Sequence, residues 1–267
     1  EDFKKYTKGA GIVSNKTVGY YVTDTTASDI IASVEDAERI GIGAAWLVSG
    51  GVAMDPITLL AATAAHTKNI KLGTAIVPFW PKHPLSMAQQ VMALSPLAKD
   101  RFRLGIGPSG ANGISGTYGI DYKSPLAHMK EYIKILKALL QEGSVDLDGK
   151  YYTAHAEIDS KINVPIMASA LRKGSFELCG AEADGAITYV CPGNYIHDVA
   201  LPAMKRGAEE AGRPTPPIIA SVVVCLNDKV EEVRETIKQE LGFYTTLPDY
   251  VQMFTDAGFP ESSNGQW

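Results

Sequence analysis

The stretch from Leu72 to Gly110 constrains the fold of this chain most, because two short apolar runs flank one amphipathic run. The first run, LGTAIVP, is rich in β-forming residues, and the second, RFRLGIG, ends in small residues. Between them, HPLSMAQQVMALSPLA places a proline at a helix start and repeats apolar residues at helical spacing. Such a tight strand–helix–strand unit predicts a parallel sheet. Ligands bind at the carboxyl ends of such strands, so segments 78–83 and 107–110 are predicted on one functional rim.

Strand and helix patterns alternate along the whole chain. Strands are predicted at 17–22, 43–48, 70–77, 101–107, 164–170, 185–190 and 217–226. Helices are predicted between them, at 28–40, 57–66, 83–98, 124–142 and 171–180, with a last helix capped by Asp228. Repeated βα units of one composition predict a single α/β domain over residues 1–267, with 1–14 as a polar leader.

Two α/β architectures fit this alternation, an open doubly wound sheet and a closed barrel. A dinucleotide-binding open sheet would carry GxGxxG after its first strand, but Thr23–Asp24–Thr25–Thr26 stands there. We therefore predict a (β/α)8 TIM barrel with an insertion, residues 112–163, after strand 4. No apolar run of strand length follows Leu241, so the eighth strand is expected to be missing from a truncated C-terminus, or the barrel to close irregularly.

Composition argues against several classes of function. A net charge of −5 disfavours nucleic acid or an anionic membrane as a partner. The three cysteines are widely spaced and form no CxxC pair, which disfavours a metal site or a disulfide framework and favours reduced thiols. No apolar run is long enough to span a membrane, and a cytoplasmic protein is expected.

Three segments carry a family resemblance: LGTAIVPFWPKHPLSMAQQ, DRFRLGIGPSG and VPIMASALRKGSFELCGAEADGAITYV. They resemble the bacterial luciferase-like oxidoreductases, and more narrowly the branch that uses the deazaflavin coenzyme F(420). The resemblance implies a luciferase-like barrel with the cofactor at its mouth, where a hydride passes to or from a small organic substrate. Coenzyme F(420), an 8-hydroxy-5-deazaflavin, is the expected cofactor, and FMN is the alternative. The family also implies that a homodimer can form through barrel helices.

The start of the helix after strand 164–170 is a candidate phosphate site. Free backbone N–H groups and the helix dipole favour an anion there, and two cations in the first turn make sense if an anion is bound. The matching family position binds the cofactor's phosphate, and the residues carried over are Ser169, Ala170, Arg172, Lys173 and Gly174. A plain βα turn with solvated charges is the alternative.

The resemblance also locates the cofactor ring. It implies a non-prolyl cis peptide at the end of the third strand, whose bulge supports the ring, at Thr74, Ala75 and Ile76. Small residues after the fourth strand would let a cofactor approach the backbone, although a tight loop alone would also use them. These residues are Gly107, Pro108 and Ser109, and Tyr189 and Val190 are expected to border the phosphate and polyol chain.

No catalytic residue is predicted. Sugar-phosphate-oxidising relatives carry a His after the second strand and a Glu after the fourth, where this chain has Ser49–Gly50 and Gly110, so that activity is not supported. His83 is expected to cap or pack, and His128 to be structural. Other polar candidates near the rim are Asp24, Ser49, Ser109 and Tyr118, and candidates to line an apolar pocket are Met54, Phe79, Trp80 and Tyr118.

Four functions remain open, in order of preference. The first is a deazaflavin-dependent oxidoreductase acting on an apolar or conjugated small molecule, and the second is an FMN-dependent luciferase-like monooxygenase. The third is a non-catalytic (deaza)flavin-binding protein. The fourth is a phosphosugar lyase or isomerase, ranked last because Lys71 lies at the wrong end of its strand for that chemistry.

Overall fold

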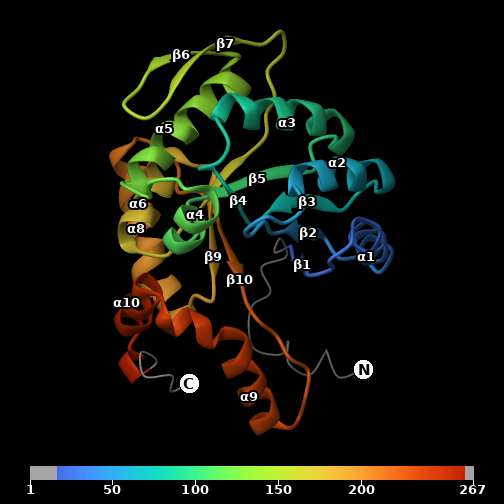
Figure 1. Cartoon of the computed structure of the whole chain (residues 1–267), viewed down its shortest axis with the longest axis vertical. Helices are drawn as coiled ribbons and strands as arrows, with labels where there is room; N and C mark the ends of the chain where they lie inside the picture. The colour runs from blue at the N-terminus through green and yellow to red at the C-terminus, as the bar shows by residue number, and fades with distance from the viewer. Residues whose placement is uncertain (1–16, 262–267) are drawn as a thin grey trace.

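A parallel β-sheet runs through residues 17–261, the part of the chain that the computed structural model describes (Figure 1). Its strands follow the order β1-β2-β3-β5-β8-β9-β10, and the short β4 (Val77–Pro78) also pairs with β5. The strands are β1 (Gly19–Val22), β2 (Ala44–Leu47), β3 (Lys71–Thr74), β5 (Phe102–Gly107), β8 (Ile166–Ser169), β9 (Gly185–Tyr189) and β10 (Ile218–Ser221). This succession is that of a (β/α) barrel, and a strand lies within each of the seven predicted segments, with 70–77 divided into β3 and β4. Within residues 17–261, no pairing joins β10 to β1, so this sheet curls without closing.

Helices connect the strands and bury apolar faces against the outer side of the sheet. They are α1 (Ala27–Arg39), α2 (Pro56–His66), α3 (Pro84–Ala98), α6 (Lys173–Glu182) and α8 (Leu201–Glu210), with short turns α7 (Gly193–Tyr195) and η3 (Ile196–Ala200) before α8. Thr26 and Asp55 cap α1 and α2 by accepting backbone N–H groups, and proline occupies the first turn of α2 and α3. The predicted helix at 171–180 begins two residues later, at Lys173.

The inner face of the sheet carries little side chain on several strands. Trp46 of β2 lies across Gly19 and Gly73, because a Cβ on Gly73 would come within 2.3 Å of the indole ring and one on Gly19 within 2.7 Å. A larger residue at either position would collide with the tryptophan, so these glycines give the indole its place inside the sheet.

The insertion after β5 contains α4 (Ala111–Tyr118), α5 (Pro125–Lys137), the π-helical turn η2 (Ala138–Glu142) and the antiparallel hairpin β6 (Ser144–Asp148) and β7 (Thr153–Glu157). The predicted helix 124–142 is therefore α-helical only to Lys137, and Gly143 ends the π turn with a φ of 101°. The hairpin was not predicted. Glu131 of α5 anchors its turn by accepting the N–H groups of Lys150, Tyr151 and Tyr152 at 3.0, 2.8 and 3.2 Å.

Two predictions for the C-terminal part were wrong. The strand expected at 217–226 stops at Ser221, because β10 pairs only with β9 and the described chain places no strand on its other edge. Val222 and Leu226 are consequently exposed. The last long helix, α9 (Val230–Leu241), is not capped by Asp228: Lys229 is its N-cap residue, and no side chain of the described residues caps the helix. The turn η4 (Gly242–Thr246) and α10 (Pro248–Asp256) follow, and the predicted leader 1–14 lies outside the described residues.

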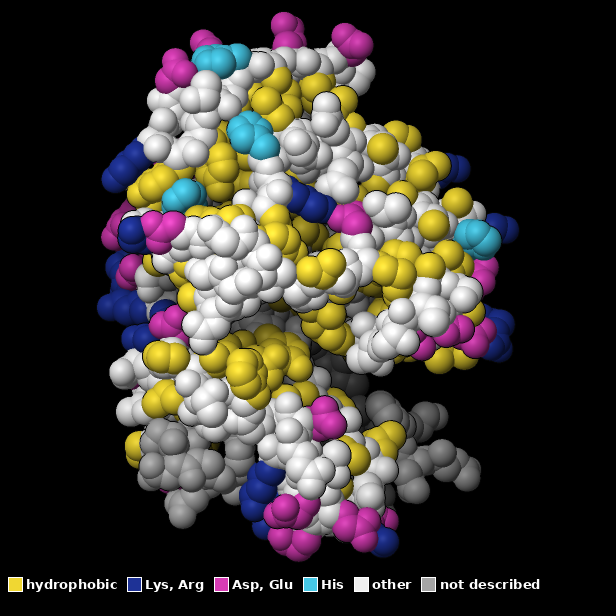
Figure 2. Space-filling model, in the orientation of Figure 1, with side chains coloured by type: hydrophobic (Ala, Val, Ile, Leu, Met, Phe, Trp, Pro, Cys, Tyr) yellow, Lys and Arg dark blue, Asp and Glu magenta, His cyan; other side chains and the backbone are white. Residues whose placement is uncertain are grey.

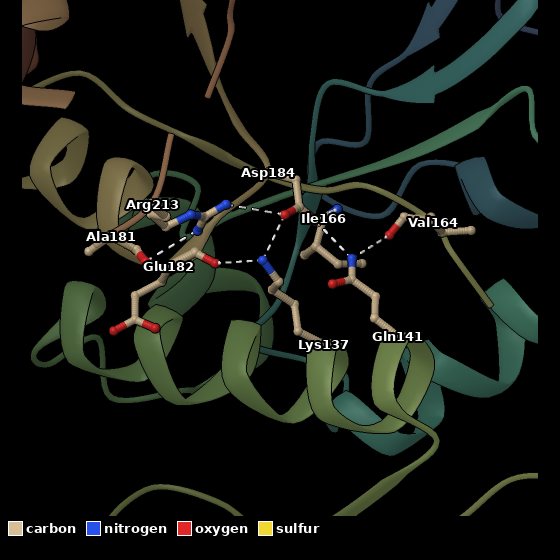
Figure 3. A network of polar contacts seen from close by, with 8 residues as sticks. All are labelled: Lys137, Gln141, Val164, Ile166, Ala181, Glu182, Asp184 and Arg213. Atoms are coloured by element: carbon tan, nitrogen blue, oxygen red, sulfur yellow. Dashed lines mark hydrogen bonds and ion pairs between the residues drawn. The ribbon is translucent and has the colours of Figure 1, made fainter. Parts of the chain in front are cut away.

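A half-buried charge network holds the amino ends of β8 and β9 (Figure 3). Asp184, which precedes β9, accepts the N–H of Ile166 at 2.9 Å, the amide of Gln141 at 2.8 Å and the ammonium of Lys137 at 2.6 Å. Arg213 lies 3.5 Å from the same carboxylate. The network ties α5 to the sheet at the end opposite the predicted cofactor residues, where barrel residues serve stability.

Candidate functional site

The carboxyl ends of β3, β5 and β8 bring three predicted segments into contact. A Cβ on Gly107 would lie 2.3 Å from the hydroxyl of Ser169 and 3.0 Å from the side chain of Ile76. Thr74 is buried, and its hydroxyl both donates to the carbonyl and accepts from the N–H of Gly105, each at 2.8 Å. The structure therefore packs Ile76 and Ser169 against Gly107, while Thr74 holds β3 to β5 at Gly105 beside them.

The Ala75–Ile76 peptide bond is cis, at the position that the resemblance implies. Backbone hydrogen bonds hold both of its residues to the neighbouring strand. The N–H of Ala75 donates to the carbonyl of Leu47 at 2.7 Å, and the carbonyl of Ile76 accepts the N–H of Ser49 at 3.2 Å. This bulge is therefore fixed against the end of β2 on one side, while β4 fixes it to β5 on the other.

The N-terminus of α6 presents open backbone donors beside this surface. The hydroxyl of Ser175 accepts the N–H groups of Leu171 and Arg172 at 3.0 and 3.1 Å. The N–H groups of Lys173 and Gly174 have no acceptor within residues 17–261. Lys173 and Gly174 are both exposed, so a ligand can reach this helix start. The arrangement can hold an anion through backbone N–H groups and the helix dipole.

The two cations at this helix start differ in their surroundings. The guanidinium of Arg172 lies 3.5 Å from the carboxylate of Asp249, in α10. Lys173 is exposed and has no ion-pair partner in the described part of the chain. Asp249 therefore competes with any anion for Arg172. Sequence reasoning missed it because 77 residues separate the two.

Ser109 and Val190, which follow β5 and β9, both adopt left-handed backbone conformations, with φ values of 56° and 50°. That conformation is costly for a β-branched residue such as Val190, and residues of this kind gather at functional sites. Two aromatic side chains hold the turn after β5. The indole N–H of Trp80 donates to the carbonyl of Pro108 at 2.9 Å, and the hydroxyl of Tyr122 donates to the backbone carbonyl of Ser109 at 3.0 Å. The rim is thus held in an unusual backbone shape.

A tyrosine cluster joins β1 to β9 and was not found from the sequence. The rings of Tyr21 and Tyr189 lie 6.1 Å apart, those of Tyr189 and Tyr244 5.3 Å, and those of Tyr244 and Tyr250 4.8 Å. Burial raises the pKa of Tyr244 to about 12 and those of Tyr21 and Tyr250 further, so these phenols remain hydrogen-bond donors at neutral pH. The four residues come from four separate elements, so no local pattern reveals them.

A cleft of about 640 Å³ opens where β1 and β2 end. Thr23, Asp24 and Thr25 of the first βα loop line it, together with Val48, Val52 and Met54 of the second. Figure 2 shows hydrophobic side chains gathered around a hollow between the part of the molecule that carries β1 to β5 and the part that carries α9 and α10. Leu47, which also lines the cleft, is the residue bonded to Ala75, so the cleft borders the cis bulge.

The other predicted pocket residues have structural partners. Phe79 is fully buried, and Trp80 packs against His128, with ring centroids 4.6 Å apart. Tyr118 of α4 donates its hydroxyl to the carbonyl of Gly51 at 2.8 Å. His83 caps α3 by accepting the N–H of Leu85, as predicted. The described residues contain no group of three or more His, Cys, Asp or Glu side chains placed to hold a metal ion.

Together, the curled parallel sheet, the insertion after β5 and the strand-end surface define a barrel of the TIM type. Residues 9–264 match the family model described as luciferase-like monooxygenase, and the chain belongs to this family. None of the helices between residues 17 and 261 is long and apolar enough to cross a bilayer.

Similar proteins include enzymes that depend on a deazaflavin. The F420-dependent glucose-6-phosphate dehydrogenase of Beutenbergia cavernae is 31% identical over 201 residues, which cover 69% of this chain and 60% of that protein. The chain thus spans less than two thirds of this relative's length. The F420-dependent tetrahydromethanopterin reductase of Methanopyrus kandleri superposes with a TM-score of 0.77 at 21% identity, covering 90% of this chain and 75% of that one.

Two further structures show what the same fold holds elsewhere. An F420-dependent secondary alcohol dehydrogenase, in complex with an F420–acetone adduct, superposes with a TM-score of 0.75 at 19% identity, covering 83% of this chain and 73% of that one. A type II Baeyer–Villiger monooxygenase component from Pseudomonas putida, in complex with FMN, superposes with a TM-score of 0.68 at 19% identity. The superposition covers 92% of this chain and 77% of that one. At these identities the likeness establishes the fold.

Proposed function

We propose that this chain is an F420-dependent oxidoreductase that transfers a hydride between coenzyme F(420) and a small organic substrate at the barrel mouth. The observation that carries the proposal is the convergence of Gly107, Ser169 and Ile76 beside the open N-terminus of α6. Glycine and small side chains at these strand ends would let a planar ring approach the backbone, and the adjacent donors suit a phosphate. Relatives named as F420-dependent support the choice of cofactor.

The residues present fit the cofactor in two groups. The open N–H groups and the Ser169 hydroxyl would hold the phosphate, with positive charge from Arg172 and Lys173. The ring would lie against the cis bulge and the turn after β5. The full set proposed to bind is Thr74, Ala75, Ile76, Gly107, Pro108, Ser109, Ser169, Ala170, Arg172, Lys173, Gly174, Tyr189 and Val190. When bound, a deazaflavin supplies the ring carbon that accepts or gives the hydride.

The chain's own residues would orient the reactants and exclude water rather than shuttle protons through a His–Glu pair. Ser49–Gly50 and Gly110 offer no acid or base where sugar-phosphate-oxidising relatives carry them. The cleft beside the bulge has Val48, Val52 and Met54 on its wall. These features favour an apolar substrate over a sugar phosphate.

An FMN-dependent monooxygenase is the second candidate, since a structure of the same fold binds FMN. The donors at α6 would accept the phosphate of either cofactor. The two differ in the tail, because the deazaflavin carries a longer chain that ends in acidic residues. Lys173 is exposed and unpaired in the described chain, on the path that such a tail would take. A cytoplasmic location and a homodimer remain predictions.

Side-by-side titration with F(420) and FMN, followed by cofactor fluorescence, tests the proposal. We expect the dissociation constant for F(420) to be at least tenfold lower, a difference of ~1.4 kcal/mol. Equal or tighter binding of FMN, or oxygen consumption with reduced flavin, would replace this proposal with the monooxygenase.

A further inference from the structure

We propose that the cleft at the ends of β1 and β2 is the substrate pocket and selects an apolar molecule with one hydrogen-bond donor, an alcohol or an amine. Asp24 would accept from the donor, and the loop after β2 would cover the apolar body. The inference deepens the proposed function, on which its description as a substrate pocket rests.

The first argument is location. The cleft volume, about 640 Å³, falls within the range of ~300–1,000 Å³ typical of small-molecule pockets. One lining residue touches the proposed ring site, because the carbonyl of Leu47 accepts the N–H of Ala75 at 2.7 Å. A ligand in the cleft would therefore lie beside the cis bulge.

The second argument is the apolar wall. Val48, Val52 and Met54 are 45%, 87% and 42% exposed and lie within one short loop. The loop is held from outside, since the hydroxyl of Tyr118 in α4 bonds the carbonyl of Gly51. Large apolar side chains gathered at a cleft mark a contact surface for an apolar ligand.

The third argument is the charge that lines the same cleft. Asp24 is half-buried, and its carboxylate accepts one hydrogen bond, from the hydroxyl of Tyr20 at 3.2 Å. No cation pairs with it within residues 17–261. An ionised carboxylate only accepts hydrogen bonds and has capacity for several, so a hydroxyl or an ammonium group complements it and a ligand carboxylate is repelled.

Ligand-observed NMR on the full chain tests this selection with four probes that share one ring: benzyl alcohol, benzylamine, toluene and benzoate. We expect benzylamine and benzyl alcohol to bind more tightly than toluene, and benzoate not to bind. Asp24→Asn should raise the dissociation constant for benzylamine at least tenfold and leave that for toluene unchanged. Asp159→Asn makes the same charge change at an exposed residue outside the cleft and should change neither.

A second variant tests whether the probes bind in this cleft. Met54→Asp should weaken the binding of both toluene and benzyl alcohol, because it puts a charge on the apolar wall. The proposed preference for a hydrogen-bond donor would be overturned if benzoate bound as tightly as benzylamine. It would also be overturned if Asp24→Asn left benzylamine binding unchanged. Toluene binding that survives Met54→Asp would overturn the cleft as its location.

Cofactor titration separates this inference from the proposed function. Asp24→Asn should bind F(420) like the unaltered chain, because the proposed cofactor residues lie on β3, β5, β8 and β9 and in the turns that follow them, outside the cleft lining. Loss of F(420) affinity in this variant would overturn the claim that the cleft is separate from the cofactor site. A chain that binds the probes as described but has no affinity for F(420) refutes the cofactor and leaves the pocket standing.

Discussion

The two cations at the start of α6 differ in their surroundings. Arg172 already has Asp249 as a partner 3.5 Å away, whereas Lys173 is free within the described residues. A charge-assisted hydrogen bond to a bound anion contributes about 1.5–3 kcal/mol. If the site holds the cofactor's phosphate, removing both cations should therefore weaken cofactor binding.

We therefore expect Arg172→Ala combined with Lys173→Ala to raise the dissociation constant for F(420) at least tenfold, with little change in melting temperature. Fluorescence titration at moderate salt measures the first effect and calorimetry the second. Lys205→Ala, on the exposed side of α8, is the matched control. Unchanged affinity would show that the two charges are merely solvated.

Asp184 makes stability depend on pH. Burial raises the pKa of this carboxyl, but hydrogen bonds from Lys137, Ile166 and Gln141 outweigh burial and lower its pKa below the usual value. A carboxyl whose pKa is lowered by folding contributes stability above its unfolded pKa, and that stability is lost as the pH falls through the folded pKa.

Asp184→Asn should accordingly lower the free energy of unfolding by about 2 kcal/mol at pH 7 and flatten its decline below about pH 4. Urea unfolding at several pH values measures both effects. Asp121→Asn, in an exposed pair with Lys123, should leave the curve unchanged. An equally steep decline in Asp184→Asn would assign the acid sensitivity to other groups.

At the scale of elements, α6 and α8 touch backbone to backbone. A Cβ on Gly207 would lie 2.0 Å from the carbonyl oxygen of Glu177, and one on Gly180 2.1 Å from that of Met204. Glycine lets the helices approach this closely, and neither carbonyl can swing away as a flexible side chain would. The position of α6, and with it the open N–H groups of Lys173 and Gly174, depends on this contact.

Gly207→Ala should therefore lower the free energy of unfolding by about 2 kcal/mol. It should also weaken the binding of F(420), although Gly207 lies in α8 and not in α6. Gly116→Ala in α4 has open space around its Cβ and is the control. Denaturant unfolding and cofactor titration of both variants make the comparison, and stability loss without a change in affinity would separate the helix contact from the site.

At the scale of the whole molecule, the proposed cofactor residues come from four strands and the turns that follow them. A ligand that binds only the folded chain stabilises it by about 2.7 kcal/mol at a concentration 100 times its dissociation constant. We expect the melting temperature to rise steadily with added F(420), and FMN at equal concentration to raise it less. A melting temperature that F(420) leaves unchanged would count against a site assembled by folding.

The strand–helix alternation, the parallel barrel-type sheet and the strand ends where the candidate residues lie could all be predicted from the amino-acid sequence. These features depend on local periodicity, capping residues and prolines, which the order of residues records directly. The cis bond at Ala75–Ile76 was expected only through the resemblance, since nothing in LGTAIV marks it. The single-domain boundary and the roles of the site residues remain predictions.

Other features depend on contacts between segments that lie far apart in the sequence. The hairpin of β6 and β7 escaped prediction because each strand buries one residue, Val145 or Ala154, and so shows no apolar run. β10 ended at Ser221 because that residue pairs with Tyr189, the last residue of its neighbour β9, and local sequence does not say where the neighbour ends. The pairing of Arg172 with Asp249 and the tyrosine cluster join distant segments. Such contacts depend on how the helices and strands pack, which a local pattern does not contain.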